Sequence, residues 1–248
     1  MLLFPFVKQL AQVSERLAPV SRTPEKIKAT AFIDENQYSV PSVALSEAAR
    51  ELIRVGDITA QMVRDSCTAL INLDTSNIYR VLVQEEELVD PVSKELANFI
   101  NVLMVEDLSL VQQKRCFQLK NLLIDIERVG DMAEDIAQYA LERIENEVAF
   151  SSSAIEDLEH LWNHAHRTYL LAIQALAEGD AEKARQVCRL ESEFDRFYWR
   201  TRQAHIHRIE EGVCQPEADV IFTETLRILE RISDHADNLG VSVARSHA

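Results

Sequence analysis

Apolar residues recur at intervals of three and four positions along most of the chain, which is the spacing of one face of an α-helix. The clearest stripe consists of Leu122, Ile126, Val129, Ala133, Ile136 and Ala140. Similar stripes predict long helices over residues 46–72, 109–146, 155–177, 181–209 and 217–244, and one more helix after the turn-like residues 74–77. Glycine and proline number only 5 and 6, and no alternating β-branched runs stand out, so the sequence predicts an all-α protein.

Two segments of the chain repeat each other. Residues 122–137 (LLIDIERVGDMAEDIA) match residues 225–240 (TLRILERISDHADNLG) at an offset of 103. The identical pairs are Leu123/Leu226, Glu127/Glu230, Arg128/Arg231, Asp131/Asp234 and Ala133/Ala236. Each copy lies on the third helix of three, so we expect two tandem three-helix-bundle repeats, spectrin-repeat-like in layout, over residues 43–150 and 151–248.

Residues 1–42 precede the repeats. An apolar stripe of Leu3, Phe6 or Val7, Leu10, Val13 and Leu17 predicts a short amphipathic helix, and Pro19, Pro24 and Pro41 mark a connector after it. This helix either packs on the body or brings residues 1–18 to a membrane surface. No stretch of eighteen apolar residues is present, so we expect no membrane-spanning helix. A signal peptide is not expected either, and the sequence leaves open whether Met1 is the natural start or the chain belongs to a longer membrane transporter.

The net charge of −15 argues against nucleic-acid binding and favours cations or a basic partner surface. Four cysteines without metal-binding spacing indicate free thiols in a reducing cytoplasm. His160 and His164 lie four residues apart, which suits a transition metal, but a solvated helix face is the favoured interpretation because no acidic ligand can be placed beside them. His205 and His207 point in different directions and form no pair.

Four pairs of acidic residues in the pattern ExxxD are the strongest candidate for chemistry. They are Glu86/Asp90, Glu127/Asp131, Glu191/Asp195 and Glu230/Asp234. Each repeat has one pair on its second helix and one on its third, and these helices are antiparallel neighbours, so four carboxylates can surround one site. Oxygen ligands suit iron, manganese, magnesium or calcium, whereas the absence of thiolate spacing disfavours structural zinc.

Two alternatives remain open for these carboxylates. In the first, the carboxylates form a solvated face with ion pairs to Arg128 and Arg231. The second concerns Asp90 alone, which would cap a helix that begins at Pro91. A di-iron enzyme of the ferritin-like class needs Glu-x-x-His, and no histidine here has a glutamate three residues before it. No motif of nucleophilic catalysis is present, so we expect no enzyme but either a regulatory module or a non-catalytic helical scaffold.

The segments ERVGDMAEDIA at 127–137 and ERISDHADNL at 230–239 resemble the two ERIGDxAxNIA signatures of the PhoU family. Residues 41–57 (PSVALSEAARELIRVGD), together with the apolar start, resemble the junction between the last membrane helix and the cytoplasmic PhoU-like domain of bacterial sodium/phosphate cotransporters. The sequence departs from the signatures at Ser233, which replaces glycine, and at Asp135, which replaces asparagine. Pro91 after Asp90 is a further departure.

The resemblance implies a metal-binding regulator of phosphate transport at the cytoplasmic side of the plasma membrane. Its partner would be a membrane phosphate transporter or a histidine-kinase sensor, and a homo-oligomer is expected. The eight ExxxD carboxylates would hold metal ions, iron first, otherwise manganese, magnesium, calcium or zinc. Asp135, His235 and Asn238 are candidates for contacts behind the ligands.

Overall fold

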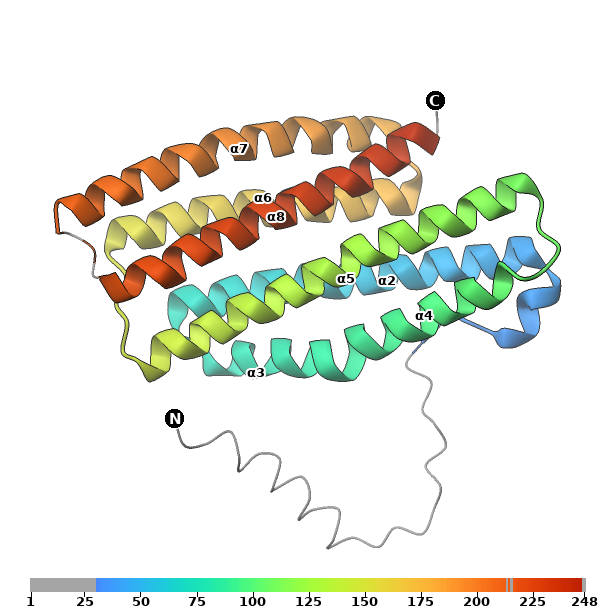
Figure 1. Ribbon diagram of the computed structural model, residues 1–248, viewed down its shortest axis with the longest axis horizontal. Helices are drawn as coiled ribbons and strands as arrows, with labels where there is room; N and C mark the ends of the chain where they lie inside the picture. The colour runs from blue at the N-terminus through green and yellow to red at the C-terminus, as the bar shows by residue number, and fades with distance from the viewer. Residues whose placement is uncertain (1–29, 213, 215, 247–248) are drawn as a thin grey trace, which may run out of the picture.

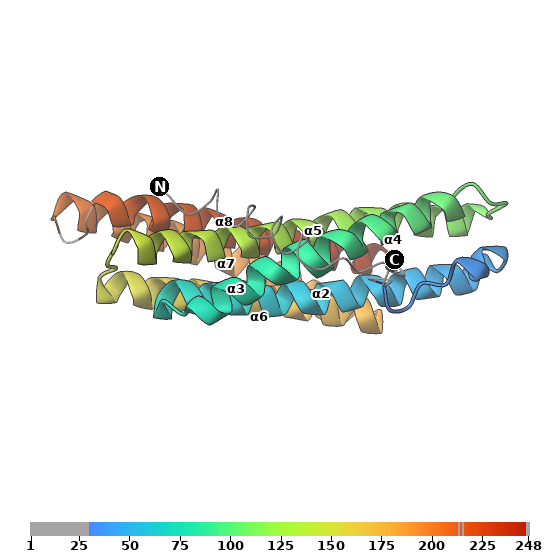
Figure 2. The same cartoon turned by 90° about the horizontal axis from the view of Figure 1, so that it is seen from below.

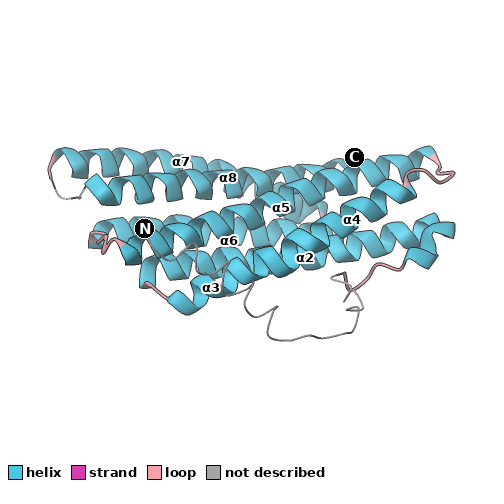
Figure 3. Ribbon diagram, turned by 60° about the horizontal axis from the view of Figure 1, so that its bottom comes forward, coloured by secondary structure: helices cyan, strands magenta, loops and turns pink. Residues whose placement is uncertain are grey.

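The computed structural model describes residues 30–212, 214 and 216–246. Its described part consists of helices joined by loops and turns and contains no strand (Figure 3). The α-helices are α2 (Pro41–Asn72), α3 (Thr75–Gln84), α4 (Asp90–Leu103), α5 (Leu110–Glu145), α6 (Ser152–Glu178), α7 (Ala181–Glu210) and α8 (Pro216–Ser246). A 3-10 helix η1 (Glu35–Ser39) precedes α2, and a π-helix η2 (Glu85–Val89) joins α3 to α4. The N-terminal helix and the membrane contact predicted for residues 1–18 lie outside the described residues.

The helices form two three-helix units, which confirms the all-α tandem architecture. One unit consists of α2, the continuous run α3–η2–α4, and α5, and the other consists of α6, α7 and α8. The units lie side by side, with α5 next to α8 and α2 next to α6 (Figure 1). Seen from its edge, the molecule is long and flat, and α5 and α8 form one layer over α2 and α6 (Figure 2). No helix in the described part is both long and apolar enough to cross a bilayer.

Side-chain caps fix the helix ends at places that the sequence indicates. Asp74 accepts bonds from the N–H groups of the first turn of α3, and Asp180 does the same for α7. Ser109 forms a capping box at the start of α5, and Ser151 caps α6. The second unit stops α6 with Gly179 at φ 64°, whereas the first stops α2 with Leu73 at φ 57°, a left-handed conformation that favours glycine.

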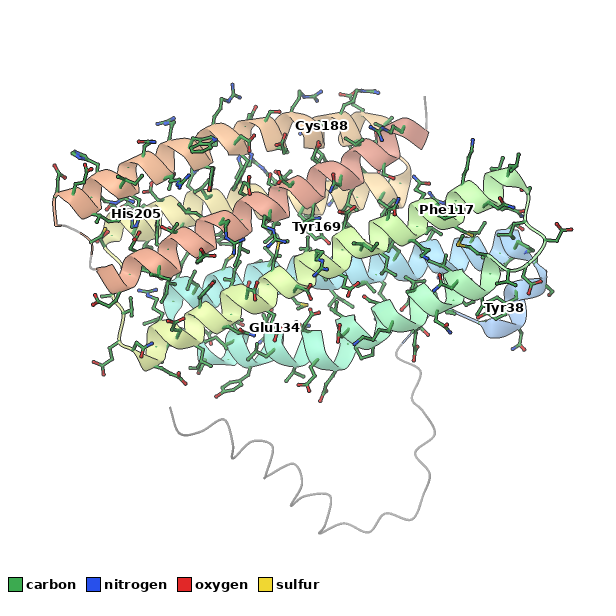
Figure 4. All side chains as sticks on the ribbon, viewed as in Figure 1. Tyr38, Phe117, Glu134, Tyr169, Cys188 and His205 are labelled. Carbon is green, nitrogen blue, oxygen red and sulfur yellow. The ribbon has the colours of Figure 1, made fainter. Side chains whose placement is uncertain are left out.

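One apolar core runs through both units. It includes buried residues from α2 to α8, and its largest fully buried side chains include Tyr169, Phe99, Phe194 and Phe222. The Tyr169 hydroxyl on α6 lies 2.8 Å from Thr59 Oγ1 on α2, so the phenol is hydrogen-bonded across the boundary between the units (Tyr169 is labelled in Figure 4). The two repeats therefore share their core rather than folding around separate ones.

Candidate metal centres

Five carboxylates of the first unit lie close enough together to interact electrostatically, and we call them the first carboxylate cluster. They come from η2, the start of α4, and α5, and they are Glu85, Asp90, Glu127, Asp131 and Glu134. Burial and the charges of the other four raise the pKa of Glu85. Burial, then Asp131, raises the pKa of Glu127, and Asp90 adds to this. The structure thus brings the second and third helices together at the predicted place.

Glu85, and not the predicted Glu86, belongs to this cluster, because Glu86 is exposed. The cause is the π-helix, in which the Asp90 N–H donates to the carbonyl of Glu85, five residues earlier. Glu85 stands eleven residues after its helix cap, as Glu191 does in the second unit, but Asp90 stands sixteen residues after the cap and Asp195 only fifteen. The wider π turn absorbs the extra residue and keeps both carboxylates on one face.

Asp90 does not cap a helix, so that alternative is wrong. Its backbone is helical, with φ −58° and ψ −51°, and its carboxylate accepts a bond from Lys94 Nζ at 2.6 Å. Pro91 follows inside the continuous helical run. Proline lacks an N–H and its ring crowds the preceding turn of an α-helix, and the π turn Glu85–Val89 lies at that preceding turn.

Glu85 is the most buried member of the first cluster, with 5% of its surface exposed. Within the described residues, neither of its carboxylate oxygens has a hydrogen-bond partner. Burial and the four neighbouring charges raise its pKa to about 8. Gly130 on α5 makes room for it, because a Cβ atom at this position would lie 2.6 Å from Glu85 Oε2. The glycine of the first signature is therefore explained by the carboxylate that faces it.

The second unit contains a matching set of five, which we call the second carboxylate cluster. Its members are Glu191 and Asp195 on α7 and Glu230, Asp234 and Asp237 on α8. Burial raises the pKa values of Glu191, Glu230 and Asp234, and the neighbouring carboxylates raise them further. Asp237 corresponds to Glu134 at the same offset of 103, so both could have been found by extending the repeat comparison one turn beyond each ExxxD.

The two clusters differ in how their charge is compensated. In the first, Asp131 pairs with Arg128 at 3.0 Å and Asp90 with Lys94, so the predicted alternative of an ion-paired face is realised at its exposed edge. In the described part of the chain, no carboxylate of the second cluster forms an ion pair, although Arg231 acts on Glu230 and Asp234 at longer range. The second cluster is thus the less neutralised of the two.

Both clusters suit hard cations by their chemistry, since they offer only carboxylate oxygens and since the oxygens of Glu85 have no protein partner. Their side chains do not converge on a single point. Among the residues that the structure describes, no group of three or more His, Cys, Asp or Glu side chains is arranged to hold a metal ion. Cation binding at either cluster would therefore require the carboxylates to rotate inward.

The residues predicted behind the ligands lie at the boundary between the units. His235 Nδ1 and Asn238 Nδ2 on α8 lie 2.8 Å and 3.0 Å from Asp125 Oδ1 on α5. They therefore hold the two repeats together instead of bonding to a cluster carboxylate. Asp135 is exposed beside Asp131, and its pKa is raised by burial and by Asp131 while Arg227 and Arg231 of the other unit lower it.

Two of the remaining histidines, His164 and His205, are buried in the helix packing. His164 is buried, with Nε2 2.9 Å from the carbonyl of Leu190, so the predicted solvated face is wrong for it; His160 is exposed and packs against Phe197. His205 is buried against Phe222 and bonds to Asp219 at 2.9 Å.

The four cysteines are free: Cys67 and Cys116 are buried, and Cys188 and Cys214 are half-buried. Cys188 and His205 are labelled in Figure 4.

Two tandem three-helix units with matched carboxylate clusters define a class of helical repeat proteins. The chain belongs to the PhoU family within that class, because the family model described as the PhoU domain matches residues 43–140 and 158–243. This confirms the resemblance seen in the two signatures.

Individual relatives agree with the assignment. The chain is 25% identical to a phosphate-specific transport system accessory protein PhoU homolog of Clostridium acetobutylicum, over 79% of this chain and 88% of that protein. It is 24% identical to the putative inorganic phosphate export protein YjbB of Escherichia coli, over 98% of this chain but only 45% of that protein. The crystal structure of PhoU from Pseudomonas aeruginosa has the same fold, with a TM-score of 0.75, 22% identity, and coverage of 82% of this chain and 96% of that one.

Proposed function

We propose that this protein is an accessory regulator of phosphate transport that acts on the cytoplasmic side of the membrane, through a phosphate transporter or its histidine-kinase sensor. Membership of the PhoU family carries the proposal. The names of relatives support it, since one is a phosphate-specific transport system accessory protein and another a putative inorganic phosphate export protein. The match to YjbB over nearly the whole of this chain also supports a place beside, or joined to, a membrane transporter.

Metal binding at the two carboxylate clusters is part of this proposal. Glu85, Asp90, Glu127, Asp131 and Glu134 would hold cations in the first unit, and Glu191, Asp195, Glu230, Asp234 and Asp237 in the second. A bound cation, iron first and manganese, magnesium, calcium or zinc otherwise, would supply positive charge that offsets the repulsion among these carboxylates. The chain's own contribution is to place five carboxylates on adjacent helices in each unit and, in the first unit, to bury one of them, Glu85.

Phosphate uptake tests the regulatory proposal. We expect cells that lack the gene to take up or export phosphate abnormally when external phosphate changes from scarce to abundant, and we expect the wild-type gene to restore the normal response. Unchanged transport across both conditions would refute a role in phosphate transport.

Elemental analysis tests the metal proposal separately. Wild-type protein purified without added metal should retain ions, and Glu230→Gln/Asp234→Asn should lose those of the second cluster while keeping those of the first. Glu142→Gln/Glu145→Gln on the exposed face of α5 is the matched control and should retain the wild-type content. Equal, near-zero metal in all three proteins would leave the second candidate, a helical scaffold with solvated acidic pairs, which the ion pair between Arg128 and Asp131 favours.

A further inference from the structure

Helix α5 carries a second apolar stripe on its solvent side. Leu110, Phe117 and Ile124 follow one another at intervals of seven residues, and 75%, 56% and 53% of their surfaces are exposed (Phe117 is labelled in Figure 4). A seven-residue interval matches one of the two contact positions per heptad at which a helix meets another in a coiled coil, and Lys114 and Asn121 stand at the other. The stripe extends for about 21 Å along the helix, which corresponds to two heptads. More than half of each of the three apolar side chains is therefore left open by the described part of the chain.

Positive charge lies along this stripe. Lys114 stands between Leu110 and Phe117 on the same face of α5, and the groove between α5 and α8 opens next to it. This groove has a volume of about 800 Å³, and its lining includes Lys114, Arg115, Phe117, Val241, Ser242 and Arg245. Among the described residues of the lining, Asp125 has the one carboxylate, and it already bonds to His235 and Asn238. In a chain of net charge −15, a groove with three cations is a local exception.

We propose that the stripe and the adjoining groove bind an amphipathic helix of a partner protein whose apolar positions are flanked by acidic residues. The apolar stripe matches the hydrophobic face of such a helix, and Lys114, Arg115 and Arg245 match its carboxylates. The proposal deepens the proposed regulatory function. It rests on that function in one respect, namely that the partner is part of a phosphate transport system. It is independent of metal binding.

Charge favours this partner helix over two other candidates for the groove, the chain's own N-terminal residues and a second copy of the chain. The chain's own residues 1–29 contain five basic residues, Lys8, Arg16, Arg22, Lys26 and Lys28, and only two acidic ones, Glu15 and Glu25, so the groove would repel them. A second copy of the chain docked symmetrically through this face would bring two cationic grooves together, which is also unfavourable.

Two synthetic helical peptides of about four heptads test the proposal, because peptides of that length can form helices in water. Both have the same leucines on one face, but one has glutamate at the flanking positions and the other has lysine. Fluorescence anisotropy with the full chain should show binding of the acidic peptide, weakening with added salt, and no binding of the basic one. Phe117→Asp, and separately Lys114→Glu/Arg115→Glu, should weaken binding of the acidic peptide about tenfold or more. The charge-reversed protein should instead bind the basic peptide.

Tyr79→Asp is the matched control, since Tyr79 is an apolar side chain that is 63% exposed on α3, away from the groove. It should change the affinity less than about twofold, and circular dichroism should show every variant to be folded. Failure of the acidic peptide to bind, equal binding of both peptides, or binding that ignores Phe117→Asp would overturn the proposal. So would a dimer that Phe117→Asp dissociates, or acidic-peptide binding that appears only after removal of residues 1–29. If the peptide test fails while phosphate transport still depends on the gene, the regulator stands and only this docking surface is wrong.

Discussion

Replacing Glu85 by glutamine should stabilise the metal-free protein at neutral pH. The pKa of Glu85 rises from its ordinary 4.5 to about 8 in the folded chain, so at pH 7 the folded protein keeps this proton and the unfolded chain releases it. The stability that is present below pH 4.5 is therefore lost progressively as the pH rises to about 8. Glutamine has nearly the same shape as the protonated acid and cannot ionise in the unfolded chain, which removes this loss.

The size of the effect follows from the two pKa values. Each pH unit between them corresponds to about 1.4 kcal/mol, so the variant should be more stable than the wild type by about 3 kcal/mol at pH 7 and by about 5 kcal/mol above pH 8. At pH 5 the difference should fall below about 1 kcal/mol. Such a change is a large fraction of the free energy of unfolding of a typical domain.

Urea unfolding with a chelator present at pH 5, 7 and 8.5 measures these differences. Glu86→Gln is the control, because it makes the same chemical change at the neighbouring exposed position, and its free energy of unfolding should follow that of the wild type at every pH. If Glu85→Gln also follows the wild type from pH 5 to 8.5, Glu85 is ionised in the folded chain, and the reasoning from its burial is wrong.

Three further substitutions test other contacts. Gly130→Ala should push the Glu85 carboxylate away from α5 and so reduce the loss of stability between pH 5 and 8.5, measured by the same urea series; an unchanged pH dependence would contradict the close approach of Gly130 and Glu85. Asp125→Ala removes the acceptor of both His235 and Asn238 and should lower the free energy of unfolding by about 1–3 kcal/mol in urea, whereas no loss would mean that these bonds do not stabilise the boundary between the units. Leu73→Gly should raise the melting temperature, with a gain of about 0.5–1 kcal/mol, because glycine adopts φ 57° without strain; a lower melting temperature would show that the lost apolar contact outweighs it.

The helices and their ends were accessible from the sequence because their signals are local. Asp74, Ser109, Ser151 and Asp180 stand where the apolar periodicity begins, and each caps the helix that follows. The first long helix begins at Pro41, five residues before the predicted start, because proline is well suited to a first helical turn. The apolar pattern does not reveal this earlier start.

The site residues were less accessible because they depend on contacts between helices. In a regular α-helix the spacing places Glu86 beside Asp90, but the wider turn of η2 shifts this position by one residue, to Glu85. The extra residue was visible only by counting from the caps Asp74 and Asp180. The pairing of His235 with Asp125 had no signal at all, because it joins two repeats whose relative placement the sequence does not encode locally.

The extra residue of η2 also leads to a prediction about the folding of the first unit. Deleting Glu87 would give the first unit the spacing of the second, with Asp90 fifteen residues after its cap and four after Glu85. The chain should then form a regular α-helix and keep α4 in register, at a cost of about 3 kcal/mol from Pro91, which the π turn no longer relieves.

Replacing Pro91 by alanine in the same chain should recover that loss. Deleting Glu193, at the corresponding place in α7, is the control: no spare residue exists there, so the rest of the helix rotates by about 100° and exposes its buried face, and the second unit should not fold. Urea unfolding and circular dichroism distinguish the two deletions. If removing Glu87 were as damaging as removing Glu193, the π turn would be a required part of the first unit and not the accommodation of one additional residue.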